Sequence, residues 1–186
     1  MRNLLLKNCD VLSFTGGKAH IEFNQDIAIQ NDFILSIEKN GHISEKNFAQ
    51  ILDMSGLLAV PGFINTHAHV PMVLFRNLAE DVTISEWFNN YIWPMEANLT
   101  AEDVFWGAQL GLAEMIENGI TCVADHYFFM DEVAKAVEIA GVRANLVWAT
   151  FAHQGEEMLA KSIEFTKRWQ GKADGRITTW LGPHAP

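Results

Sequence analysis

Two histidines separated by one small residue follow a short apolar segment in residues 61–70, PGFINTHAHV. Alternate residues of a β-strand point to the same side, so His67 and His69 would present two imidazoles together, while Ala68 leaves the opposite side small. Neutral imidazole nitrogen is a favoured ligand of Zn²⁺, and a catalytic zinc keeps one coordination position for water. The pair is therefore predicted to bind a metal ion. The alternative is two buried histidines that are hydrogen-bonded to the backbone.

A catalytic zinc site typically has three protein ligands. The candidates for a third ligand in this chain are Asp125, His126 and His184, which all follow apolar segments. Asp125 and His126 could instead be polar residues at the end of a strand, satisfied by neighbouring loops. His184 is the stronger candidate, because Gly182-Pro183 and Pro186 predict a rigid turn that would aim its imidazole.

The elements that must position these residues follow two patterns. Residues 1–60 show β-branched and period-two signals without helix-length periodicity, with a hairpin turn predicted at Asn31-Asp32 and another turn at Thr15-Gly16-Gly17. This portion is predicted to be a small sheet or one half of a β-sandwich. From Pro61 onward, strands and helices alternate. The predicted strands are 62–66, 120–124, 144–149 and 177–181, and the predicted helices are 84–91, 100–118, 130–140 and 156–170.

The helix at 100–118 has the clearest boundaries. Thr100 and Asp103 form a capping-box-like start, and Gly119 ends the helix. Residues at helical spacing predict one buried face. That face consists of Val104, Ala108, Leu112 and Ile116.

Alternating strands and helices predict parallel strands with right-handed crossovers. Four such units make half of an eight-stranded barrel. The alternatives are an open doubly wound sheet and the first four β/α units, in residues 61–186, of a barrel that continues beyond this sequence. The stop after a strand favours the second. Five of the seven histidines follow predicted strands, at the sheet edge where parallel α/β folds place their ligands. These five are His67, His69, His126, His153 and His184, whereas His20 and His42 are predicted to be surface residues.

Composition narrows the class of partner. The chain has 186 residues, of which 49% are apolar, and its net charge of −10 argues against nucleic acid or an anionic membrane as a partner. No segment approaches the roughly 20 apolar residues of a membrane span. Two cysteines, Cys9 and Cys122, are too few for a disulfide framework. A cytoplasmic protein with a small-molecule partner is predicted, as is a homo-oligomer.

Four segments together resemble the N-terminal part of an amidohydrolase-superfamily enzyme, in the methylthioadenosine/S-adenosylhomocysteine deaminase and chlorohydrolase group. They are PGFINTHAHVPMVLFRNLAED (61–81), WPME (93–96), ENGITCVADHYFFMDEVAKA (117–136) and LGPHAP (181–186). The resemblance covers essentially the whole chain. It implies a distorted (β/α)₈ barrel, preceded by a small sandwich domain and carrying one divalent metal.

The resemblance also implies roles for particular residues. His67 and His69 match the two metal ligands of the first strand. The third ligand (a histidine), the fourth (an aspartate) and the proton-shuttling glutamate are expected beyond residue 186, so this chain alone should be inactive. Zinc is the expected metal, with Fe²⁺ as the alternative. A bridging modified lysine at the end of the fourth strand, as in related two-metal enzymes, is missing from the sequence, which favours a single metal ion.

Substrate contacts are implied in the same way. Glu96 matches a glutamate that holds the ribose hydroxyls in nucleoside deaminases, and His184 matches a residue that contacts the substrate. Trp93, with Trp87 and Phe88, is predicted to form an apolar wall and lid around the ring, although ordinary core packing is an alternative for each.

The predicted reaction is hydrolytic deamination of a heteroaromatic amine of the purine or adenosine type. One position departs from the group, because Trp148 stands where an arginine would hold the amino-acid tail of S-adenosylhomocysteine; a neutral substrate is therefore predicted. A dechlorinating or amide-opening hydrolase of triazine-like rings on the same scaffold is one alternative. The other is a non-catalytic metal-binding half-barrel module, which would fold alone without exposed apolar surface.

Overall fold

The computed structural model describes residues 3–185 and has a mixed α/β fold. The chain divides into two compact units, Met1–Pro61 and Gly62–Pro186, and each has its own sheet and its own buried cluster. Within residues 3–185, no helix has the length and apolar character needed to cross a membrane.

The first unit is a five-stranded sheet with the order β3-β2-β1-β4, in which β5 also pairs with β1. β2 runs antiparallel to both of its neighbours, and β4 and β5 run parallel to β1. A single sheet corresponds to one layer of the sandwich predicted for residues 1–60. The elements are β1 (Asn3–Thr15), β2 (Lys18–Gln30), β3 (Phe33–Lys39), η1 (Glu45–Asn47), β4 (Gln50–Asp53) and β5 (Leu58–Ala59).

Two tight turns connect the antiparallel strands of this unit. Gly16 and Gly17 have φ angles of +58° and +76°, as a two-residue type I′ hairpin requires. Asn31, with a φ of +52°, begins the hairpin turn that was predicted between β2 and β3. The buried cluster of the sheet consists of Cys9, Val11 and Ile27.

The second unit is a four-stranded parallel sheet with the order β6-β7-β8-β9. All four predicted strands are present, and each extends past its predicted C-terminal end. The strands are β6 (Phe63–Ala68), β7 (Ile120–Tyr127), β8 (Arg143–Phe151) and β9 (Ile177–Ala185). The helical elements are η2 (Val70–Phe75), α1 (Ile84–Glu86), η3 (Trp87–Ile92), α2 (Trp93–Glu96), α3 (Ala101–Glu117), α4 (Met130–Ala140), η4 (Ala152–Gln154), α5 (Gly155–Trp169) and α6 (Lys172–Gly175).

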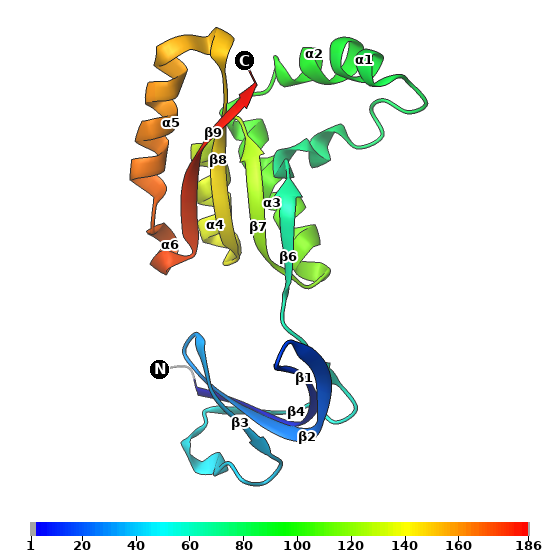
Figure 1. The fold of residues 1–186 in the computed structure, drawn as a ribbon, viewed down its shortest axis with the longest axis vertical. Coiled ribbons are helices and arrows are strands. Elements are labelled where there is room, and N and C mark those ends of the chain that lie inside the picture. Colours follow the sequence, from blue (N-terminus) through cyan, green and yellow to red (C-terminus); the bar gives the residue numbers. More distant parts are fainter. Residues whose placement is uncertain (1–2, 186) are drawn as a thin grey trace. The chain divides into compact units, whose positions relative to one another are not determined.

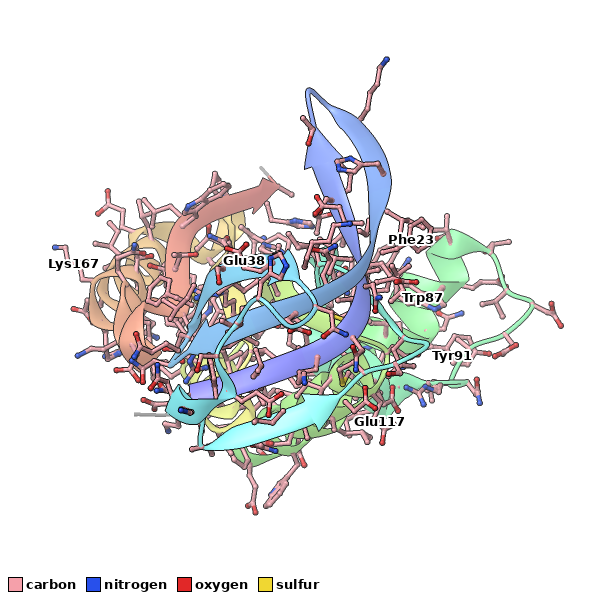
Figure 2. The ribbon with its side chains drawn as sticks, turned by 90° about the horizontal axis from the view of Figure 1, so that it is seen from below. Phe23, Glu38, Trp87, Tyr91, Glu117 and Lys167 are labelled. Carbon is pink, nitrogen blue, oxygen red and sulfur yellow. The ribbon has the colours of Figure 1, made fainter. Side chains whose placement is uncertain are left out.

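The long helices pack against the sheet, and the short helices α1 and α2 extend from its end. In Figure 1, α3 and α4 lie behind the sheet and α5 lies beside β9, while α1 and α2 project beyond the strand tips. Residues of the strands and of α3, α4 and α5 share one buried cluster, which includes Leu112, Val133, Leu146, Phe165 and Ile177. Exposed charges such as Glu117 and Lys167 lie on these helices (Figure 2).

Most of the prediction for the helix at 100–118 is confirmed by α3. Thr100 and Asp103 form the complete capping box, in which each side chain accepts a hydrogen bond from the other residue's backbone N–H. Val104, Ala108 and Leu112 are fully buried, but Ile116 is 47% exposed.

The turn predicted at Gly182-Pro183 is wrong. Both residues belong to β9, where they pair with Ala149 and Thr150 of β8. Pro186, the other residue of that prediction, lies outside the described residues.

The predicted helix at 84–91 is present but irregular. Thr83 and Glu86 form a capping box at its start, after which η3 is wound as a π-helix and α2 continues from it with Pro94 in its first turn. A π-helical segment is rare and is often found at functional sites.

Two glycines of α3 allow η2 to approach the helix backbone. A methyl group on Gly111 would lie 2.8 Å from Cγ1 of Val70, and one on Gly107 would lie 2.9 Å from the carbonyl oxygen of Pro71. Both contacts are shorter than van der Waals distance. Because η2 begins immediately after His69, these two glycines help to fix where that imidazole lies.

We expect Gly111→Ala to destabilise the protein by about 1–3 kcal/mol, the usual cost of overpacking. This is opposite to the usual gain from Gly→Ala within a helix. The measurement is the thermal unfolding midpoint of the purified full-length protein. Ala113→Gly, at an exposed position of the same helix, is the matched control and should show the ordinary preference for alanine. A higher midpoint for Gly111→Ala would contradict the packing argument.

Candidate functional site

A cavity of about 690 Å³ opens at the C-terminal ends of the parallel strands. The strand ends contribute His126 and Tyr127 from β7, Phe151 from β8 and His184 from β9, while His69 follows β6. The helical segment 84–96 forms the opposite wall. That wall consists of Trp87, Phe88, Ile92, Trp93 and Glu96.

The structure brings most of the sequence-predicted site residues to this cavity. His69, Trp93, Glu96 and His184 all line it. His67 does not; with His69 it lines a neighbouring cavity of about 370 Å³. His69 therefore lies between the two cavities and adjoins both.

The two histidines are close enough to share an ion. Their ring centroids are 5.3 Å apart, and the ring planes are nearly perpendicular, at 85°. Nδ1 of His69 lies 2.5 Å from the carbonyl oxygen of His126. A carbonyl can only accept, so Nδ1 carries a proton, and in the neutral imidazole Nε2 keeps its lone pair. A backbone acceptor of this kind commonly orients metal-binding histidines, and the arrangement fits a metal ligand.

The third-ligand candidates do not complete this pair. Across residues 3–185, no group of three His, Cys, Asp or Glu side chains is arranged to hold a metal ion. His126 and His184 instead lie near each other, with ring centroids 4.9 Å apart. Asp125 points into the protein, where one carboxylate oxygen accepts the N–H of Val70 at 2.9 Å.

Asp125 and His126 have displaced pKa values that reflect burial. Burial raises the pKa of Asp125 to about 7, against the opposing effect of hydrogen bonds from the backbone of Val70 and His126. Burial, together with smaller contributions from the neighbouring imidazoles of His184, His69 and His67, lowers the pKa of His126 to about 4. His126 is therefore a neutral imidazole at pH 7, while Asp125 anchors the backbone immediately after His69.

Glu96 is a half-buried carboxylate in the cavity wall. Burial raises its pKa, and the hydroxyl of Tyr127 and the ring of His69 partly offset this effect. It is the only acidic residue among the described residues that line the cavity, and none of them is lysine or arginine. Glu96 and several histidines are thus the ionisable acidic and basic side chains among the described residues that line the cavity.

Aromatic rings form most of the remaining wall. Trp87 contacts Phe88 edge to face at a centroid distance of 4.8 Å, and Phe88 contacts Trp93 at 5.2 Å. The stick view in Figure 2 labels Trp87 on this segment. Across the cavity, Phe128 stacks on Phe151 at 6.3 Å. A flat heteroaromatic ring is the kind of ligand that such walls suit.

Comparison with known proteins identifies the family. Residues 58–186 match the model of the amidohydrolase family. The chain belongs to the amidohydrolase family. It is 47% identical to a 5-methylthioadenosine/S-adenosylhomocysteine deaminase from Carboxydothermus hydrogenoformans, over 98% of this chain and 42% of that protein. It is 41% identical to a 5′-deoxyadenosine deaminase from Methanosarcina acetivorans, over 100% of this chain and 43% of that protein. The chain therefore spans less than half the length of these relatives.

Solved structures resemble this amidohydrolase chain over nearly its whole length. An adenosine deaminase from Xanthomonas campestris with bound zinc has a TM-score of 0.87 and 28% identity, covering 100% of this chain and 43% of that one. An atrazine chlorohydrolase from Arthrobacter aurescens TC1 complexed with zinc has a TM-score of 0.83 and 20% identity, covering 97% and 46%. The second likeness, at this low identity, shows the fold alone.

The role given to Trp148 in this amidohydrolase is wrong. Its ring packs edge-on against Phe165 of α5, with centroids 5.7 Å apart, on the helix side of the sheet. Its neighbour Ala149 lines the cavity. Because adjacent strand residues point to opposite faces, Trp148 points away from the cavity, and its identity carries no information about a substrate tail.

Several cavity residues of the amidohydrolase chain were not predicted from its sequence as site residues. Tyr127, Phe128, Phe151 and Gln154 lie just past the predicted strand ends. The strand-end rule that selected the histidines would have found the three aromatic residues too, had it been applied to aromatic side chains as well as to metal ligands, but it would not have found Gln154.

Proposed function

We propose that this chain is part of a metal-dependent amidohydrolase that deaminates an adenosine-type nucleoside. The observation that carries the proposal is the placement of a histidine pair and a half-buried carboxylate, Glu96, around one cavity walled by aromatic rings. The names of the relatives at 47% and 41% identity, and of the zinc-bound structure at 28%, support it.

In this proposal the two parts of the chain have different roles. Residues 1–60 are a portion of the small sandwich domain, and residues 61–186 are the first four β/α units of the catalytic barrel. The remaining metal ligands and the proton-shuttling glutamate are expected from residues beyond 186.

One divalent metal ion, zinc with Fe²⁺ as the alternative, is held by His67 and His69. When bound, such a metal lowers the pKa of a water ligand toward 7 and so makes hydroxide available at neutral pH. His69 binds through Nε2, because its Nδ1 proton is donated to the carbonyl oxygen of His126. The buried carboxylate of Asp125 holds the backbone of Val70, which keeps His69 in place.

The other residues bind and orient the substrate. Glu96 accepts hydrogen bonds from the ribose hydroxyls, and His184 contacts the heteroaromatic ring. Trp87, Phe88 and Trp93 cover the ring and exclude water. A neutral 5′ substituent suits the described wall, since a carboxylate tail would meet Glu96 and no lysine or arginine there.

The triazine alternative has weaker support. Its structural likeness is at 20% identity, and a triazine has no ribose for a half-buried glutamate to hold. The non-catalytic alternative does not account for the aromatic cavity beside the histidine pair.

The test is a measurement of ammonia and chloride release by the zinc-loaded full-length protein. The panel contains adenosine, 5′-deoxyadenosine, 5′-methylthioadenosine, S-adenosylhomocysteine and a chlorotriazine. We expect ammonia from the nucleosides, most efficiently from those with neutral 5′ groups, and no chloride. Chloride release without ammonia would favour the triazine alternative, and no turnover at all would contradict the proposal.

A further inference from the structure

Tyr127 has a buried hydroxyl whose role the proposed function leaves open. It is the last residue of β7, only 3% of it is exposed, and it lines the cavity. Among residues 3–185, its hydroxyl oxygen has no hydrogen-bond partner. Buried tyrosine hydroxyls are normally paired, so an unpaired one beside a binding cavity needs an explanation.

Among the charged groups near this hydroxyl, the carboxylate of Glu96 has the largest effect on its pKa. Burial raises the pKa of Tyr127, and the negative charge of Glu96 raises it further, with a smaller effect from Asp125. In return, the Tyr127 hydroxyl lowers the pKa of Glu96 against the effect of burial. Both side chains line the same cavity, and the Tyr127 hydroxyl has no hydrogen bond within the described residues.

The two residues differ in how firmly their backbones are held. Tyr127 lies in a parallel strand that pairs on both sides, opposite Trp148 in β8. Glu96 ends the four-residue helix α2, which is reached through the π-helix η3. A carboxylate on such a short helix would be held in position by a hydrogen bond from a donor on a firmly paired strand. Its two oxygens have about four acceptor sites, enough for one tyrosine and two ribose hydroxyls.

We propose that Tyr127 is a positioning residue: its hydroxyl donates to the Glu96 carboxylate and holds it where it accepts the ribose hydroxyls. This inference rests on the proposed function. In the substrate-bound state the two side chains come within hydrogen-bond distance of each other. The hydroxyl then pairs with Glu96, while the ribose occupies the remaining lone pairs of the carboxylate.

Tyr127→Phe in the full-length, zinc-loaded protein tests this role with two substrates, adenosine and 2′,3′-dideoxyadenosine. We expect KM for adenosine to rise about tenfold, the scale of a hydrogen bond to a charged group, with kcat within about twofold of wild type. Both constants for the dideoxy substrate should be unchanged, because it has no hydroxyl for Glu96 to hold. The other tyrosine of this sequence, Tyr91, is the matched control: it lies in η3 but does not line the cavity, and Tyr91→Phe should leave both substrates unaffected.

A second variant separates positioning from general damage to the fold. On a Glu96→Ala background, Tyr127→Phe should no longer change KM for adenosine, because the group it positions is gone. An equal loss on both substrates, a loss in kcat alone, or unchanged kinetics for an active enzyme would overturn the inference while leaving the proposed function intact. A wild-type protein that releases no ammonia from either substrate would overturn both.

Discussion

Replacing His69 with alanine in the full-length protein should remove both the bound metal and the release of ammonia. We expect zinc content to fall from about one ion per chain to near zero, and kcat/KM to fall by a factor on the order of 10³ or more. The reason is geometric. His69 is the imidazole whose tautomer is fixed by a backbone carbonyl, and it adjoins both the aromatic cavity and the smaller cavity of His67. His67→Ala should act in the same direction.

The measurement pairs elemental analysis of the purified protein with steady-state kinetics on adenosine. His42→Ala is the matched control, because His42 is exposed in the first unit and far from the cavity in sequence. It should retain metal and turnover. If the His69 and His67 variants both keep full zinc and full activity, the metal pair is wrongly placed, and the proposed function loses the feature on which it depends.

The sequence was most informative where periodicity and chemistry agreed. Helix α4 has the predicted bounds, and the capping box of α3 was visible in Thr100 and Asp103. The histidines were placed correctly relative to the strands, because parallel strands bring their C-terminal ends to one edge. His67 and His69 proved to be near neighbours, as the alternation of a strand requires.

The failures have a common physical origin. The prediction for the last strand stopped at Leu181, its last apolar residue, although the ladder between β8 and β9 continues through Gly182 and Pro183. The β-strand propensity of a residue does not reveal whether it pairs with another strand more than 30 residues away in the sequence. The misplaced role of Trp148 is of the same kind, since the face on which a residue lies depends on strand register and not on its neighbours in sequence. Tyr127 was missed because an unpaired hydroxyl is visible only in three dimensions.

The second large effect concerns the 186-residue chain expressed by itself. Thr179 of β9 faces α5, where its hydroxyl donates to the carbonyl oxygen of Thr166. Trp180 therefore points to the opposite face of the sheet, and it is 69% exposed; Phe63 of β6 is 62% exposed. Parallel sheets are normally covered on both faces. In the described residues, the long helices cover one face (Figure 1).

We expect this isolated chain to bind an apolar dye such as ANS strongly, to unfold without a sharp transition and to release no ammonia, whereas the full-length protein binds little dye. Zinc affinity should also be weak, because two imidazoles are short of the three ligands that a catalytic zinc requires. Trp180→Ser in the isolated chain should reduce dye binding, and Trp106→Ser, at an exposed position of α3, should reduce it less.

The non-catalytic half-barrel alternative makes the opposite prediction, because a complete module must cover its own apolar faces. Cooperative unfolding of the isolated chain, with no dye binding and a tightly held zinc ion, would support that alternative over an enzyme. The exposed fractions of Trp180 and Phe63 argue against it, since single exposed apolar residues are ordinary but two large ones on the outer strands of a parallel sheet are not. In the proposed complete barrel, the uncovered face that carries Trp180 would be enclosed as part of the barrel interior.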